Sequence, residues 1–150
     1  MLRRRARERK WASIFAEDLL RGCSDLYTVF GGDVLNLPIS IPIDERAVVL
    51  LQPRGPLEAP RVPATMTVTR PASGAYGVNI RRIDEGPMII PGLDDLPLTD
   101  LTFLLTVEGL EIGPGELPLD ETTARALANA LLITIGMKLA KAGHGQGATP

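Results

Sequence analysis

The pattern of apolar and polar positions is most regular near the end of the chain. Across residues 119–143, apolar side chains recur at the i, i+3, i+4 spacing of one buried helical face, at Ala124, Leu127, Ala128, Leu131, Leu132, Ile135 and Leu139. Asp120 suits the N-cap, where its carboxylate accepts from free backbone N–H groups, and Gly143 suits the left-handed position after the last turn. The pattern predicts one helix of about six turns.

The same helix carries a second apolar stripe, formed by Ala126, Ala130, Ile133 and Met137. A helix that is apolar over most of its circumference needs cover on more than one side. We expect the protein's own sheet on one side, and either the N-terminal helix or another copy of the protein on the other. Ala126, Ile133 and Met137 are therefore predicted to lie in a protein interface.

The start of the chain predicts a second helix, over residues 2–21. Trp11, Ile14, Phe15 and Leu19 share one narrow stripe, and Gly22 is expected to end the helix. We predict that Trp11 and Phe15 contact a protein partner. Residues 23–33 are expected to form a connector with a flexible corner at two consecutive glycines. Its cysteine, Cys23, is interpreted as a small buried apolar residue and not as a nucleophile.

The middle of the chain predicts short strands, over residues 36–42, 46–52, 64–70, 75–81, 87–90 and 101–107. The first holds two prolines, which predicts an edge strand or an extended arm. The second is a continuous apolar run, typical of a strand buried on both faces. Residues 53–63 hold four prolines and predict a loop.

Two connections decide how these strands pair. Residues 71–74 (PASG) suit a tight turn, so residues 64–81 are predicted to form a hairpin. The odd-numbered side chains of residues 101–107, including Val107, are expected to face inward. Two outcomes remain open for the connection that follows. Either Glu108 and Gly109 form a hairpin turn, or Gly109 forms a bulge within one long strand.

These elements predict an α+β fold, an antiparallel sheet or sandwich of about five to seven strands flanked by an N-terminal and a long C-terminal helix. The expected division is a basic helix or arm over residues 1–22, one domain over 23–143 and a flexible tail over 144–150. The 13 prolines and 15 glycines agree with short strands and many turns. The sequence contains no run of 18 or more apolar residues, so it predicts no transmembrane helix.

The charge of the chain is divided unevenly. Residues 1–22 carry seven basic and three acidic side chains, a net charge of +4, whereas the remaining residues carry nine and fifteen, a net charge of −6. Such an arm is attracted to an anionic partner or to the acidic face of a neighbouring copy. We predict anionic-partner contacts at Arg3, Arg4, Arg5, Arg7, Arg9 and Lys10.

Four interpretations of this arm remain open. It is the solvated start of a packed helix, a contact with another protein subunit, a contact with nucleic-acid phosphates, or a membrane-surface anchor that uses Trp11 and Phe15.

The sequence predicts no catalytic, cofactor or metal site. The single histidine, His144, lies in a glycine-rich tail without a rigid frame or a partner. Asp94, Asp95 and Asp100 lie close together along the chain, but they supply fewer oxygen ligands than Ca²⁺ requires and match no calcium-loop motif. The chain has neither a phosphate-binding loop nor zinc-ligand spacing.

Residues 66–77 (MTVTRPASGAYG) combine a strand, an Arg-Pro turn and a Gly-x-Tyr sequence. The segment resembles the first hairpin of small tailed-phage neck proteins of the head–tail connector or head-closure type. In this chain the hairpin lies in the middle and a long helix follows, which departs from that pattern. The resemblance implies a ring-forming virion component without a catalytic site.

The sequence therefore favours a non-enzymatic structural or assembly protein that binds other copies of itself or other assembly subunits. We expect it in the cytoplasm, or in a virion assembled there. The alternative is a module that binds nucleic acid or an anionic surface through its basic arm. A third hypothesis is an enzyme with an acidic site that no motif identifies.

Overall fold

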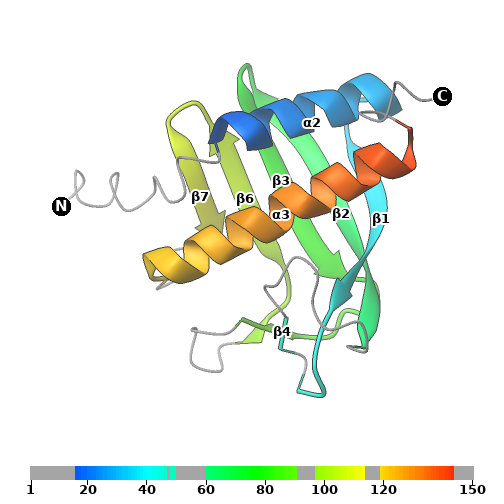
Figure 1. The fold of residues 1–150 in the computed structure, drawn as a ribbon, viewed down its shortest axis with the longest axis vertical. Helices are drawn as coiled ribbons and strands as arrows, with labels where there is room; N and C mark the ends of the chain where they lie inside the picture. The colour runs from blue at the N-terminus through cyan, green and yellow to red at the C-terminus, as the bar shows by residue number, and fades with distance from the viewer. Residues whose placement is uncertain (1–15, 47, 50–59, 91–96, 114–118, 144–150) are drawn as a thin grey trace.

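A computed structural model describes residues 16–46, 48–49, 60–90, 97–113 and 119–143. It confirms the α+β class: one five-stranded antiparallel sheet carries two helices on the same face (Figure 1). The elements in chain order are α2 (Ala16–Phe30), β1 (Leu35–Pro42), β2 (Arg61–Ala72), β3 (Ala75–Arg82), β4 (Met88–Ile89), β5 (Pro97–Leu98), β6 (Leu101–Thr106), β7 (Gly109–Gly113) and α3 (Glu121–Lys141).

The strand order is β1-β2-β3-β6-β7, and β4 and β5 pair separately as a small ribbon. Alternate residues of each long strand face the helices, as the period of two in a strand requires. Met66, Val68, Val78, Phe103 and Leu105 are all buried in this way. The core is therefore a single layer of mostly aliphatic side chains between the sheet and the two helices.

Both ends of α3 agree with the sequence prediction. The Asp120 carboxylate accepts a hydrogen bond of 2.7 Å from the backbone N–H of Thr123, and this bond lowers the pKa of Asp120. Gly143 follows the last turn with φ of +87°, a conformation that favours glycine. The first apolar stripe is buried as expected, except that Leu132 is only half-buried.

The predicted end of the first helix at Gly22 is wrong, because α2 continues to Phe30. Gly22 is buried, and a Cβ atom there would lie 2.9 Å from Cγ2 of Ile135 on α3. The glycine therefore permits close helix packing and does not end the helix. α2 ends instead before Gly31 and Gly32, whose φ values are +73° and +83°. The predicted domain boundary after residue 22 falls inside this helix.

The predicted hairpin over residues 64–81 is confirmed, with Ser73 and Gly74 between β2 and β3. β2 begins at Arg61, so the last three residues of the predicted proline-rich loop belong to a strand. Of the predicted strand at 46–52, the structure describes residues 46, 48 and 49. Val48 and Val49 form isolated β-bridges with Ile89 and Ile43 and are half-buried, whereas Arg46 lies in a turn. The Asp44 carboxylate accepts from the backbone N–H groups of Arg46 and Val48 and holds a turn there.

The connection after β6 is a tight hairpin, so the bulge alternative is wrong. Thr106 pairs with Gly109, which leaves Val107 and Glu108 as the turn, one residue earlier than predicted. Val107 was expected to face inward, but its side chain is 81% exposed, since it lies in the turn and not in the strand. Leu110 and Ile112 of β7 are buried, which explains why the apolar pattern resumes out of phase.

Candidate functional site: the groove between β1 and α3

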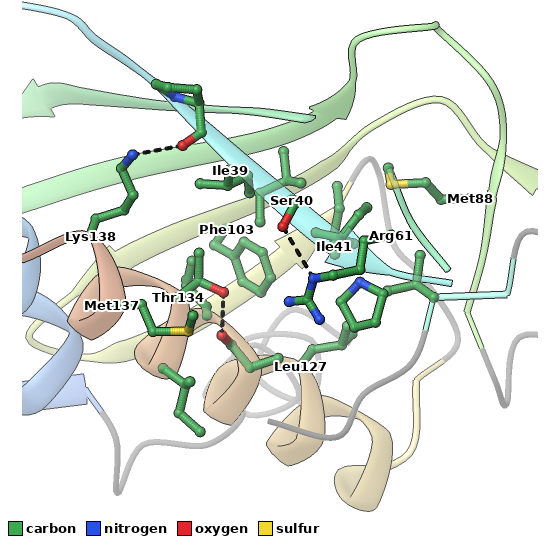
Figure 2. Close-up of a pocket in the computed structure, with 18 of the residues that line it drawn as sticks. Ile39, Ser40, Ile41, Arg61, Met88, Phe103, Leu127, Thr134, Met137 and Lys138 are labelled. Carbon is green, nitrogen blue, oxygen red and sulfur yellow. Dashed lines mark hydrogen bonds between the residues drawn. The ribbon is translucent and has the colours of Figure 1, made fainter. Parts of the chain in front are cut away.

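An apolar groove of about 420 Å³ lies between the edge strand β1 and helix α3 (Figure 2). Ile39 and Ile41 of β1 form one wall, and Phe103 of β6 lies at its centre. The opposite wall belongs to α3 and consists of Leu127, Ala130, Leu131, Ile133, Thr134 and Met137. A volume of this size is in the range of about 300–1,000 Å³ that binding pockets occupy.

The groove lies on the flank of α3 that α2 leaves uncovered. α2 packs against the Ile135 side of α3. At about 100° per residue, Ile133 and Met137 point to nearly the opposite side of the helix. Met137 is 58% exposed, whereas Ile133 is half-buried. Ala130, Ile133 and Met137 of the second apolar stripe therefore open onto the groove, on a flank of the helix that α2 does not cover.

Three cationic side chains also line the groove, Arg61, Lys138 and Lys141. None of the described lining residues is an aspartate or a glutamate. Burial lowers the pKa of Lys138, and the neighbouring charge of Lys141 lowers it further. Among the lining residues that the structure describes, these positive charges therefore have no carboxylate counterpart. An apolar ligand group with an adjacent anion would complement both features of this surface.

Two of these cations hold β1 in place. The Lys138 ammonium donates to the backbone carbonyl of Pro38 at 2.7 Å, and Nε of Arg61 donates to Oγ of Ser40 at 3.2 Å (Figure 2). Lysine has three donors and arginine five, so both retain donors for a further partner. The groove wall is thus tied to α3 at one point and to β2 at another.

Strand β1 is an edge strand, as its prolines predicted. The Lys138 ammonium of α3 donates to the Pro38 carbonyl, so this acceptor of β1 is already engaged by the helix. Pro42 lies four residues further along the strand, so its backbone carbonyl points in the same direction as that of Pro38. Neither proline has an N–H group to offer a further strand. The geometry thus favours side-chain docking in the groove over addition of a strand to β1.

The structure brings together part of the predicted interface. Ile133 and Met137 both line the groove, whereas Ala126 is half-buried on α3 and does not line it. Trp11 and Phe15 lie outside the described residues, as do the basic residues Arg3, Arg4, Arg5, Arg7, Arg9 and Lys10. Contacts of the arm with a partner remain predictions.

Cys23 is buried on α2, as its interpretation as an apolar residue requires. Burial raises the pKa of its thiol to about 12, which keeps the thiol neutral and unreactive near neutral pH. Asp100 accepts from Asn79 at 2.8 Å, while Asp94, Asp95 and His144 lie outside the described residues. No group of three or more potential metal ligands occurs in the described part of the chain.

Sequence reasoning identified the helical wall of the groove but missed the wall that β1 supplies. Residues 36–42 alternate and hold two prolines, which predicted an edge strand or an extended arm. What the pattern could not indicate is that Ile39 and Ile41 lie opposite the second stripe of α3. Arg61 was missed because it fell in the stretch predicted to be a loop.

Comparison with known proteins gave no relative: the chain matches no protein-family model, no curated protein and no solved structure. The resemblance of residues 66–77 to phage neck proteins remains a prediction. Among the described helices, none has the length and apolar character needed to cross a membrane.

Proposed function

We propose that this protein is a non-enzymatic assembly module that binds a second copy of itself through the groove between β1 and α3. It would work in the cytoplasm, or in a virion assembled there. The observation that supports the proposal is that apolar side chains of α3, including Ile133 and Met137, face an open groove. Apolar surface of this kind on a soluble domain is typical of an interaction site.

Charge favours a second copy as the occupant. Residues 23–150 carry a net charge of −6. The groove, in contrast, is lined by Arg61, Lys138 and Lys141, with no acidic side chain among its described lining residues. The acidic body of one copy is thus electrostatically complementary to the groove of another. The chain's own basic arm, in contrast, would be repelled by these cations.

The test is the mass of the purified protein in solution, measured by light scattering over a range of micromolar concentrations. We expect an oligomer for the wild type and a monomer for Met137→Asp, which places a charge in the apolar part of the groove. Thr122→Asp is the matched control, since it adds the same charge to an exposed position of the same helix outside the groove. A wild-type protein that stays monomeric would overturn the proposal.

Nucleic-acid binding through the arm remains the alternative. Its test is titration of duplex DNA with the full chain at several salt concentrations, because phosphate contacts weaken steeply with salt. Salt-dependent binding that is lost on deleting residues 1–10 would favour this alternative.

A further inference from the structure

We propose that the turn of the β6–β7 hairpin, Val107 and Glu108, is the part of a second copy that enters the groove, so that copies join head to tail. This inference rests on the proposed self-assembly and adds which surface meets the groove.

Charge argues against the simplest alternative, a symmetric pair in which two α3 helices face each other. A twofold contact brings the same patch of both copies together. Lys138 and Lys141 of one copy would then approach those of the other, and like charges at an interface disfavour association. The groove therefore needs a different surface of the second copy, with an apolar side chain and a carboxylate.

The hairpin turn supplies both groups. Val107 is 81% exposed, the largest exposed fraction among the large apolar side chains of the described residues. Glu108 follows it directly and is also exposed. The backbone N–H of Glu108 donates to Oγ1 of Thr106 at 3.1 Å, which helps to hold the turn. An apolar tip on a short hairpin is thus presented beside a negative charge.

A second exposed apolar residue, Ile83, is less suited to the groove. It is 57% exposed and lies beside Asp84. The Asp84 carboxylate, however, is already bound by the Arg82 guanidinium at 2.7 Å and by the backbone N–H of Gly86. Its charge is therefore largely neutralised within the same chain, which makes Ile83 a useful control.

The groove and the hairpin turn lie toward different ends of β6. Leu101 lines the groove at the start of β6, while the hairpin turn follows the last residue of that strand, Thr106. β1 and β7 are also the two opposite edges of the sheet (Figure 1). A turn at one end that fits a groove at the other makes a heterologous contact, which generates a ring or an open chain of copies.

The experiment uses two variants of the full chain, each disabled on one side. Val107→Lys replaces the apolar tip with a charge that the groove repels, and Met137→Asp disables the groove. We expect each variant alone to be a monomer. Mixed in equal amounts, they retain one intact turn and one intact groove, and should form a particle of twice the 16.1 kDa protomer mass and nothing larger. Ile83→Lys should assemble like the wild type.

Far-UV circular dichroism of each variant is the control for an intact fold, and we expect spectra like that of the wild type. A mixture that stays monomeric would overturn the head-to-tail contact. The same conclusion would follow if Val107→Lys assembled like the wild type while Met137→Asp did not, although self-assembly through the groove would then stand. A wild-type monomer would overturn both proposals.

A milder variant tests separately what the attraction between the Glu108 carboxylate and the groove cations contributes to binding. Glu108→Gln, which removes the charge and keeps the shape of the side chain, should raise the dissociation constant by up to about fivefold, the effect of losing an exposed ion pair of about 1 kcal/mol. An unchanged or lower dissociation constant would contradict the placement of Glu108 beside the groove cations.

Discussion

The two apolar stripes of α3 are built from the same kinds of residue but lie in different surroundings. The first, which includes Leu131 and Ile135, is buried in the core, although Leu131 also lines the inner wall of the groove. The second, which includes Ile133 and Met137, faces the groove and is partly exposed. The comparison teaches that an apolar helical face predicts contact with other apolar surface. Which element makes that contact, and whether one does so within the same chain, depends on the tertiary fold. Four measurements separate the two stripes.

Leu131→Asp should give the largest effect. Leu131 is only 1% exposed, and burial of a leucine side chain contributes about 1.5–3 kcal/mol. The substitution also places a charge without a partner in the core, so we expect a loss of more than about 4 kcal/mol, close to complete unfolding. Urea unfolding and near-UV circular dichroism measure it. A folded, cooperative Leu131→Asp protein would contradict the burial of the first stripe.

The next effect is a pH dependence at Cys23, on the helix that covers the first stripe. Burial raises the pKa of this thiol from 9.0 to about 12. Between these values the unfolded chain loses the thiol proton and the folded chain retains it. The free energy of unfolding should therefore be unaffected by this group below about pH 9 and should fall above it, by at most about 1.4 kcal/mol per pH unit.

The control for this prediction is Cys23→Ala, which removes the thiol and retains all other titrating side chains, including Tyr27, whose pKa is raised mainly by burial and also by Cys23. Urea unfolding of both proteins, from about pH 8 to about pH 11, should show the steeper decline in the wild type. Equal slopes would mean that the thiol titrates at its ordinary pKa and is not buried.

Gly22→Ala should destabilise the protein by about 1 kcal/mol, although alanine is the better helix former by about the same amount. The added Cβ would lie 2.9 Å from Cγ2 of Ile135, and overpacking typically costs about 1–3 kcal/mol. Ile135→Leu removes the branch at Cβ. The double variant should therefore lose less than the sum of the two single losses, in a double-mutant cycle of urea unfolding. An additive cycle would show that the two side chains do not meet.

Met137→Asp should give the smallest change in stability, within about 0.5 kcal/mol, because the Met137 side chain is 58% exposed. The contrast with Leu131→Asp is direct, since an aspartate replaces a large apolar residue in both variants, six positions apart on one helix. A loss as large as that of Leu131→Asp would mean that the second stripe belongs to the core. Urea unfolding under conditions where the protein is monomeric gives the value.

The fold class, α3 and its caps, the edge strand and the central hairpin could all be predicted from the sequence. Each follows from a local signal: helical spacing, an N-cap aspartate, paired prolines or a turn sequence. The true end of α2 could not be predicted, because Gly22 acts through a tertiary contact with Ile135. A glycine that ends a helix and one that admits a neighbouring helix look alike in the sequence.

The groove was only half predictable for a related reason. The apolar face of α3 was visible in its spacing, but the facing wall comes from β1, about a hundred residues earlier in the chain. The exposure of Val107 was also missed. The alternation of β6 would place its side chain inward, but the strand ends at Thr106 and Val107 lies in the turn. Local pattern thus predicted which side chains are apolar, and only tertiary placement decided which of them are exposed.

The prolines of β1 and the bond from Lys138 to Pro38 have a consequence for behaviour at high concentration. Amyloid-like growth needs a free row of backbone donors and acceptors that successive chains can copy. Along β1 that row is interrupted at Pro38 and Pro42. Crowded molecules can therefore meet at this side of the sheet through their side chains without nucleating a fibril there.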